Sequence, residues 1–450
     1  MVQATAWFFT FYHELLLACA SGIILLGLDD LIVFFVWLVR VTPKAAVLMR
    51  MPVERPPIAI FVPAWDESSV IGRMLATLLD RMDYTKYIVF VGCYQNDSGT
   101  LSAVQEIAEN DARVQLVSGN LDGPTTKAEC LNRCWHALCE WEVQHEVQFA
   151  AVVLHDAEDV VHRDELNLFS AHLPYADMIQ LPVVPFIDIS MPWVSGHYAD
   201  EFALTHGIDM PTRQILGSAL PSAGVGCAIS RPALARIASG RGGLPFDADS
   251  LTEDYELGLR LGELGCRTSF VREISAVTHD LIAVRAYFPS DLASAVRQKS
   301  RWILGIALFG WDRLGWHGSM VDRWMRLRDR RALLSAFLLL LSYISLFMSA
   351  GVIMFAGAAS GTVPPLSPTL QMALGASGAM LAWRLLERAV VVFCGYGLKQ
   401  ALFSIPRALV ANMIAMVAAR RAFMAYLRYE VRHPVIWDKT SHVFPDDPAI

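Results

Sequence analysis

Long apolar runs at both ends of the chain are the feature that most limits how it can fold. Leu15–Val39 reads LLLACASGIILLGLDDLIVFFVWLV, about the length that crosses the hydrocarbon core of a bilayer. Ala332–Gly357 is a second such run, and Leu370–Trp383 is a shorter third one that can continue past Arg384. Of the 450 residues only 18% are charged and 54% are hydrophobic, whereas an ordinary soluble domain has about 25% charged residues. The sequence therefore predicts three membrane-spanning helices.

Basic residues next to these runs indicate which side of the membrane each segment faces. No Lys or Arg precedes the first run, and a basic group follows it: Arg40, Lys44, Arg50 and Arg55. Five arginines lie just before Ala332. Because cytoplasmic segments are enriched in Lys and Arg, we expect a multi-pass protein whose central segment lies in the cytoplasm.

Charged residues interrupt the apolar pattern at two places. Asp29 and Asp30 lie near the middle of the first run, where an isolated carboxylate costs ~2.5–3.5 kcal/mol. Pairing with Arg384 or Arg388, a polar pathway for a product, and a shifted helix boundary are all open for this pair. The stretch Ala389–Ala419 is apolar but broken by charges and a proline, which is typical of an interfacial helix pair or a re-entrant element.

The central segment has the pattern of an α/β domain. Short apolar runs predict four strands: Ile58–Val62, Tyr87–Cys93, Val114–Val117 and Val147–Leu154. Helical periodicity separates them, over Val70–Met82, Ser98–Asn110 and Thr126–Glu142. Alternating strands and helices favour a mostly parallel, Rossmann-like sheet, in which ligands bind beyond the carboxyl ends of the strands.

These patterns divide the chain into five segments. Residues 1–50 are expected to form the first membrane helix and a linker, 51–300 the α/β domain, 301–331 amphipathic interfacial helices, 332–425 transmembrane or interfacial helices, and 426–450 a cytoplasmic tail.

Two common nucleotide-binding classes and nucleic-acid binding are disfavoured. The first strand runs into Pro63-Ala64-Trp65-Asp66-Glu67, which has neither the GxGxxG of a dinucleotide fold nor a P-loop. A net charge of −7 provides no basic footprint for nucleic acid. Hydride transfer and ATP hydrolysis are therefore not expected.

Three groups of residues point to chemistry. Asp156 and Glu158 follow the fourth strand, and paired carboxylates there suit Mg²⁺ or Mn²⁺, although acidic pairs after strands are common without a metal. Ser250-Leu251-Thr252-Glu253-Asp254 opens a helix: Ser250 and Glu253 fit a capping box, and Asp254 is left over as a candidate general base.

The third group is Gln298-Lys299-Ser300-Arg301-Trp302, which lies just before the membrane half. An interfacial helix with aromatic anchors explains it structurally. An Arg that binds a diphosphate, with a Trp that stacks on a sugar ring, explains it functionally.

Taken in order, these motifs resemble membrane-integrated family 2 glycosyltransferases, the processive enzymes with a GT-A fold. The resemblance covers residues 56 to 302 and continues into the membrane half. The resemblance rests on Asp66/Glu67, Asn96-Asp97, Lys127, Asp156-x-Glu158, Thr252-Glu253-Asp254 and Gln298-x-x-Arg301-Trp302. The segments Val91–Asp97, His155–His162 and Trp437-Asp438-Lys439-Thr440-x-His442 look like the phage-adsorption protein B branch.

The resemblance implies a role for each of these residues. Asp66, Glu67, Asn96 and Asp97 would hold the nucleoside of a UDP-sugar, with Lys127 nearby. Asp156 and Glu158 would hold Mg²⁺ or Mn²⁺ on the diphosphate, and Gln298, Arg301 and Trp302 would close over it. Asp254, supported by Thr252 and Glu253, would deprotonate the acceptor. Gly224 and Gly226 would let the backbone approach the acceptor sugar, or are turn glycines.

The expected function is inverting transfer of a sugar, with an N-acetylhexosamine as the branch-level choice, to a growing polysaccharide that is moved through a bacterial inner membrane. A non-processive transferase acting on a lipid phosphate, or a non-catalytic membrane receptor or adaptor, remains open, as do envelope export partners. Asp66 stands where many relatives have Asn, and Glu158 replaces the second Asp of the usual pair, so the choice of metal stays open. Relatives in this branch carry a C-terminal cyclic-di-GMP module that the resemblance does not include, so direct control by that messenger is not expected.

Overall fold

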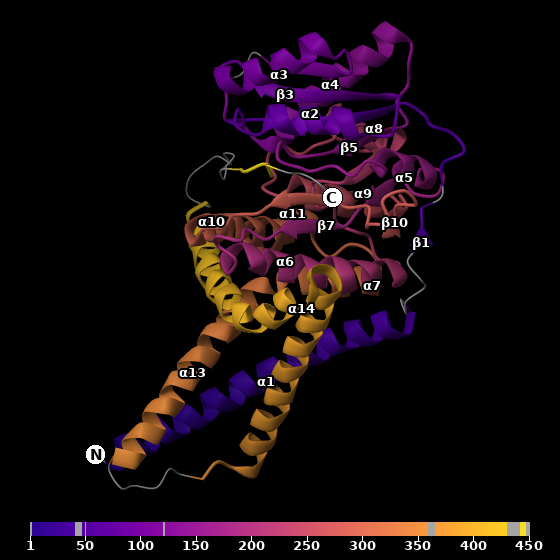
Figure 1. Ribbon diagram of the computed structural model, residues 1–450. Helices are drawn as coiled ribbons and strands as arrows, with labels where there is room; N and C mark the ends of the chain where they lie inside the picture. The colour runs from indigo at the N-terminus through magenta and orange to yellow at the C-terminus, as the bar shows by residue number, and fades with distance from the viewer. Residues whose placement is uncertain are drawn as a thin grey trace.

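A computed structural model describes residues 2–40, 47–49, 51–119, 122–358, 365–429 and 442–446 of the protein. An α/β domain forms one end of the molecule, and three long helices extend from its underside (Figure 1). Of the residues singled out above, Lys44, Arg50 and Trp437–Thr440 lie outside the described residues.

The domain is built on a sheet of seven strands in the order β4-β3-β2-β5-β8-β6-β9. β8 is antiparallel to both of its neighbours, and every other adjacent pair is parallel, which confirms the mostly parallel sheet. The strands are β2 (Ile58–Pro63), β3 (Tyr87–Tyr94), β4 (Val114–Gly119), β5 (Ala151–Leu154), β6 (Met178–Gln180), β8 (Cys227–Ser230) and β9 (Thr268–Phe270).

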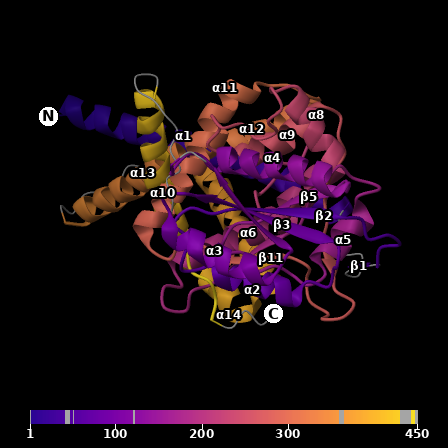
Figure 2. The ribbon, with the colours of Figure 1, turned by 90° about the horizontal axis from the view of Figure 1, so that it is seen from above.

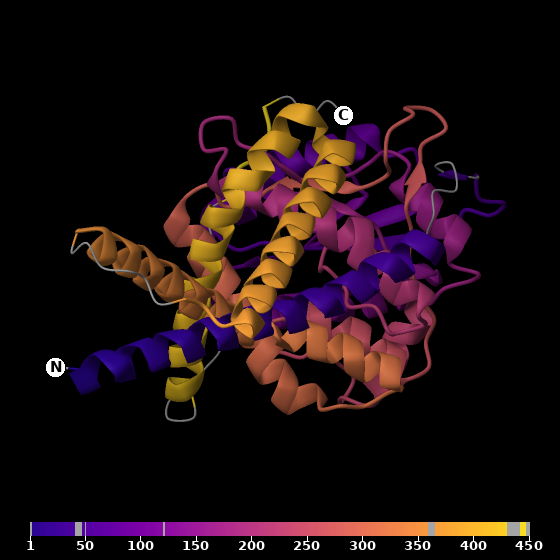
Figure 3. The same ribbon diagram turned by 90° about the horizontal axis from the view of Figure 1, so that it is seen from below.

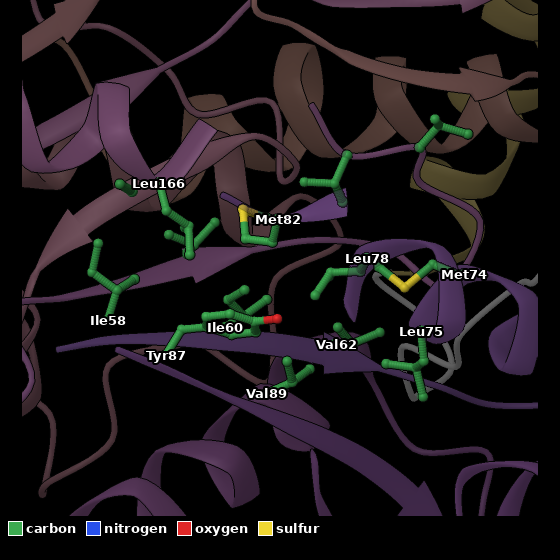
Figure 4. Packing of buried hydrophobic residues seen from close by; sticks show 14 of the residues in the cluster. Ile58, Ile60, Val62, Met74, Leu75, Leu78, Met82, Tyr87, Val89 and Leu166 are labelled. Atoms are coloured by element: carbon green, nitrogen blue, oxygen red, sulfur yellow. The ribbon is translucent and has the colours of Figure 1, made fainter. Parts of the chain in front are cut away.

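Alternation along β2 divides the core into two layers, because successive strand residues point to opposite faces of a sheet. Ile58, Ile60 and Val62 face α2 (Ile71–Arg81), α3 (Ser98–Asn110) and α5 (Glu165–His172). Figure 4 shows the first of these layers, with Met74, Leu75 and Leu78 of α2 packed on the strand. Ala59 and Phe61 face α4 (Lys127–His145), α8 (Arg231–Ser239) and α9 (Glu253–Glu263). Helices thus cover both faces of the sheet, as seen from above in Figure 2.

The predicted elements of the first half are close to those observed, with one exception. The fourth strand begins at Ala151, not at Val147. The chain leaves α4 through Glu146 in a left-handed conformation, and the Phe149 N–H donates to the Glu142 side chain. Val147 and Phe149 are therefore bonded to the end of the helix, and the chain meets the sheet only from Ala150, whose backbone bonds to Pro57 and Arg231.

Below the sheet, short elements form a layer that adjoins the long helices. Two short strands, β7 (Val183–Phe186) and β11 (Val284–Tyr287), pair in parallel, as do β1 (Val47–Leu48) and β10 (Glu273–Ile274). The helices are α6 (Val194–Leu204), the π-helix η1 (Thr205–Asp209), α7 (Met210–Ile215), α10 (Leu292–Trp302), the π-helix η2 (Ile303–Phe309), α11 (Gly310–Leu314) and α12 (Met320–Arg330).

Three helices of the described chain are long and apolar enough to cross a membrane. They are α1 (Val2–Arg40), α13 (Ala332–Ala358) and α14 (Pro368–Tyr429), in agreement with the three predicted spans. α14 is interrupted at Gly397, whose φ of 78° suits glycine. Beyond this break it runs back beneath the domain and packs on α6 and α10 (Figures 1 and 3).

Asp29 and Asp30 lie at the junction between α1 and the domain. Asp30 does pair with Arg384, at 3.5 Å, but Arg388 forms no ion pair with either carboxylate. The main partners are Arg328 and Arg331, which bind both aspartates. The partner helix was missed because α12 is far along the chain and only the fold brings it to α1.

Candidate active site

One pocket collects most of the side chains singled out from the sequence. It lies at the carboxyl ends of β2 and β5, above α10. Of the predicted site residues it is lined by Glu67, Lys127, Asp156, Glu158, Thr252, Glu253, Asp254, Gln298, Arg301 and Trp302. The pocket therefore joins residues that are separated by more than half of the chain.

Lys127 and Asp156 meet at the ends of two neighbouring elements. Asp156 follows β5, which pairs with β2 as far as the hydrogen bond from the His155 N–H to the Phe61 carbonyl. Lys127 begins α4, whose N-cap is Thr126. Its Nζ lies 2.5 Å from Asp156 Oδ1. Burial disfavours the ammonium, but the carboxylates of Asp156, Glu253 and Asp254 together outweigh it and raise the pKa of Lys127. Asp156 thus holds the Lys127 ammonium at the carboxyl edge of the sheet.

Glu158 lies in a group of three potential metal ligands with Glu67 and His442. Their donor atoms all lie within 4.8 Å of one another. His442 Nδ1 is 2.7 Å from Glu67 Oε1 and 3.2 Å from Glu158 Oε2, and this last atom is buried without a hydrogen-bond partner among the described residues. Burial, and next the carboxylates of Asp156 and Glu67, raise the pKa of Glu158 to about 8. Burial opposes the charged form of His442, but Glu158 and Glu67 raise its pKa to about 9.

His442 reaches the pocket on a short segment, residues 442–446, that packs on α2. Phe444 is buried in the same cluster as α2, and Arg73 donates to the carbonyl oxygens of Phe444 and Pro445. The sequence placed His442 in a motif but gave it no role in the site. The Trp-Asp-Lys-Thr-x-His motif was the signal, and nothing local indicated where the histidine would lie.

Thr252, Glu253 and Asp254 enter the pocket at the start of α9. Thr252 is the N-cap but makes no side-chain capping bond, and Ser250 donates to Glu256 instead. The predicted capping box between Ser250 and Glu253 is therefore wrong. Glu253 is left facing the pocket, where burial and the neighbouring Asp254 raise its pKa to about 7. Burial also raises the pKa of Asp254, against the effect of Lys127.

The two glycines behave differently. A Cβ on Gly224, whose φ is 77°, would lie 2.4 Å from Asp254 Oδ2, so the missing side chain makes room for that carboxylate. A Cβ on Gly226 would instead meet Val284 of β11 at 2.6 Å. Gly224 thus borders the candidate base, whereas Gly226 is needed for packing between strands.

Gln298, Arg301 and Trp302 come from the last turns of α10 and form the wall nearest the long helices. The Gln298 Oε1 atom is buried without a partner among the described residues. Trp302 belongs to a cluster of aromatic rings with Phe202 and Phe288, which also line the pocket. Neither phenylalanine was predicted from the sequence, because single aromatic residues on separate elements form no recognisable pattern.

Asp66, Asn96 and Asp97 lie outside the set that lines the pocket and form a rim beside β2 and β3. Asp97 caps α3, accepting from the Thr100 N–H, and also accepts from the Asp66 N–H at 2.5 Å. The Asn96 side chain bonds to both backbone groups of Gly123. These contacts connect the end of β2 to the start of α3 and hold the chain at Gly123 beside the end of β3.

The donor set fits a divalent cation. Two carboxylates and one imidazole converge, one carboxylate oxygen lacks a donor, and the negative charge exceeds what His442 and Lys127 offset. The set differs from the predicted pair, since Asp156 is bound by Lys127 and lies outside the three-ligand group.

Comparisons with known proteins agree with this geometry. Residues 56–305 match the family described as "Glycosyltransferase like family 2". The chain is 37% identical over 458 residues to "Bacteriophage adsorption protein B" of Escherichia coli K12 and equally to "Bacteriophage N4 adsorption protein B" of E. coli O157:H7. The match covers 93% of this chain but 60% of either relative, so the chain spans about three fifths of their length.

The fold is similar to that of a solved glycosyltransferase. A mannosyltransferase from Pyrobaculum calidifontis, in complex with GDP-Man and Mn²⁺, superposes with a TM-score of 0.55 at 19% identity. The superposition covers 91% of this chain and 99% of that protein. The likeness extends beyond the sheet to the helical half of the molecule and supports the GT-A fold.

Proposed function

The chain belongs to the family 2 glycosyltransferases, and from that premise we propose that it transfers a sugar, with inversion, from a UDP-sugar to a growing polysaccharide at a membrane. The observation that carries this proposal is the convergence of Lys127, Asp156, Asp254 and Arg301 on one pocket. An adaptor that had only kept the fold would have no need of this charge arrangement. The donor sugar we favour is an N-acetylhexosamine.

In this proposal Asp254 is the general base. It accepts the proton of the acceptor hydroxyl as that oxygen attacks the anomeric carbon, and the bond to UDP breaks on the opposite side. A base needs a pKa closer to neutrality than that of an ordinary aspartate, and burial raises the pKa of Asp254 in that direction. Gly224 leaves room for its carboxylate.

The diphosphate is held by fixed positive groups. Lys127 and Arg301 both line the pocket and offset the charge that develops on the leaving UDP, an effect that often dominates catalysis. A divalent cation held by Glu158, Glu67 and His442, with Asp156 nearby, would neutralise the diphosphate oxygens. An imidazole among carboxylates favours Mn²⁺ over Mg²⁺, which prefers oxygen ligands, and the P. calidifontis enzyme holds Mn²⁺.

The acceptor approaches from the side of the long helices. There the pocket wall changes from carboxylates to the rings of Phe202, Phe288 and Trp302, and aromatic faces suit the apolar faces of sugar rings. Residues 51–300 are then the catalytic domain, and the helical segments hold it at the membrane and take part in moving the product.

Membrane placement is supported by the surface of α14. Beyond Gly397 its outward face carries exposed apolar side chains at helical spacing, Leu402, Ile405, Leu409, Met413 and Val417. A helix with one packed face and one exposed apolar face fits the plane of a bilayer surface. We assign the chain to a bacterial inner membrane with its domain in the cytoplasm. A product that reaches the cell surface is consistent with relatives named for bacteriophage adsorption.

The test is release of UDP by the purified full chain in detergent, with several UDP-sugars and with Mn²⁺ or Mg²⁺, followed by sizing of the product. Release of UDP with a ladder of long products supports polymer synthesis. A single sugar on a lipid would favour the non-processive reaction instead, and absence of UDP release from every donor would refute the proposed transfer.

A further inference from the structure

A buried imidazole lies directly behind the pocket and has no part in the chemistry proposed so far. The His155 side chain is fully buried between two buried carboxylates. Its Nδ1 is 3.0 Å from Asp159 Oδ2, and its Nε2 is 2.7 Å from Glu165 Oε1. Burying three ionisable groups is costly unless each is hydrogen-bonded. Simple packing would be met by an apolar side chain, so this arrangement calls for a reason.

The reason lies in the turn that follows β5. Asp159 Oδ2, the atom that contacts His155, also accepts the backbone N–H of Asp156 at 2.9 Å. In the opposite direction the Asp159 N–H donates to the Asp156 carbonyl at 3.2 Å. These two bonds close the turn 156–159, and the side chains of Asp156 and Glu158 project from it into the pocket.

A continuous series of bonds therefore connects the core to the turn. It starts at Glu165 in the first turn of α5, passes through the His155 ring to Asp159, and ends at the Asp156 backbone. α5 is buried in the core, with Leu166 in the main cluster (Figure 4). The His155 ring thus connects the turn 156–159 to α5, which is packed in the core.

The far end of the same loop is also fixed. The Val160 N–H donates to the Arg285 carbonyl at 2.7 Å, and the Arg285 N–H returns a bond at 3.1 Å. His162 Nδ1 accepts from the Asp164 N–H, and its Nε2 lies 3.1 Å from Asp280. With its downstream end tied to β11, the turn is held on its core side by the contact between Asp159 and His155.

We propose that His155 is a positioning residue that, through Asp159, sets the turn carrying Asp156 and Glu158 and so presets the metal and diphosphate site. The inference rests on the proposed function, since it concerns the ligands assigned there. Substituting a residue that orients a metal ligand by hydrogen bonding commonly lowers metal affinity about 10–100-fold.

The two ring nitrogens allow a directional test. In His155→Asn the amide stands near Nδ1 and keeps the contact with Asp159. In His155→Gln the amide stands near Nε2, keeps the contact with Glu165 and loses Asp159. Mn²⁺ binding to the full chain without donor is measured by electron paramagnetic resonance, and Tm by thermal unfolding. We expect Mn²⁺ affinity to fall about 10–100-fold in His155→Gln and less than about threefold in His155→Asn.

His172→Asn is the matched control, because its shorter amide stands near Nδ1 and loses the contact that His172 makes through Nε2. His172 lies on the same helix and its Nε2 is 2.9 Å from Glu273, but this pair is remote from the pocket. Its variant should lose stability and keep Mn²⁺ affinity. Should His155→Gln not fold, Glu165→Gln loosens the same series of bonds and is expected to weaken Mn²⁺ binding as well.

Equal Mn²⁺ affinities in His155→Asn and His155→Gln, or unchanged affinity in Glu165→Gln, would overturn the positioning role. The proposed function fails differently. In that case the unaltered chain itself releases no nucleotide from any sugar donor, whatever the variants do to Mn²⁺ affinity.

Discussion

Two groups of carboxylates lie partly or fully buried in this molecule, and their negative charge is offset to different extents. At the junction of α1 with the domain, Asp29 and Asp30 each meet at least two arginines, and Trp324 donates to Asp29. In the pocket, six acidic side chains face three basic ones, Lys127, Arg301 and His442. Within the described chain, neither Glu253 nor Asp254 forms an ion pair there.

The difference separates a structural use of charge from a functional one. An aspartate with two arginines is satisfied within the protein and gains nothing from an added ligand. Burial, and next the neighbouring carboxylates, raise the pKa of Glu253 and of Glu158, and a cation or a proton relieves this crowding of charge. The comparison predicts that substitutions in the pocket affect catalysis, and that those at the junction affect stability.

The largest expected effect is that of Asp254→Asn. Loss of the base should lower sugar transfer by about 10³-fold or more, because the acceptor hydroxyl is no longer deprotonated. UDP affinity, measured by calorimetry, should change less than about threefold, since Asp254 lies on the acceptor side. Near-normal turnover in a radiolabelled-sugar assay would remove Asp254 from the mechanism and weaken the distinction between the two groups.

Asp29→Asn should have the next largest effect, on stability. It leaves Arg328 and Arg331 partly buried with less opposing charge, for a loss of about 2 kcal/mol in unfolding free energy. Denaturant unfolding in detergent measures it, with the exposed Asp80→Asn as control at less than about 0.5 kcal/mol. Transfer activity per folded molecule should not change. A drop in activity with normal stability would show that the junction has a functional role.

The smallest effect is an increase in stability that depends on pH. Glu253 has a pKa of about 7 in the folded state against an ordinary value of 4.5, so the unfolded chain binds fewer protons between these values and stability falls as pH rises through this range. Glu253→Gln cannot ionise and should be more stable than the unaltered chain by about 1 kcal/mol at pH 5.3 and nearly equal to it at pH 4. Unfolding at the two pH values, with metal removed, tests this. A variant less stable than the unaltered chain at pH 5.3 would contradict the raised pKa of Glu253.

Sequence periodicity was enough for the first half of the domain, where each element is short, regular and adjacent to the next. β2, β3, α2 and α3 all begin within one residue of the predicted position. The start of β5 was misplaced because the end of α4 draws the preceding residues away from the sheet, a tertiary effect that no local pattern records.

The site was predictable where its residues follow strands or open helices, and not where the fold alone joins distant segments. Asp156, Glu158 and Asp254 lie at such ends and do line the pocket. His442, Phe202 and Phe288 come from elsewhere, as do the arginines that bind Asp29. Their roles depend on how segments far apart in the chain meet.

The position of His442 bears on how the site matures. During synthesis the ribosome delivers Glu67 and Glu158 early, and α13 and α14 follow before the histidine emerges. The three ligands can therefore be assembled only after both long helices have been made. A fragment that stops after the catalytic domain would lack His442, so assembly of the three-ligand site depends on synthesis of the helical half.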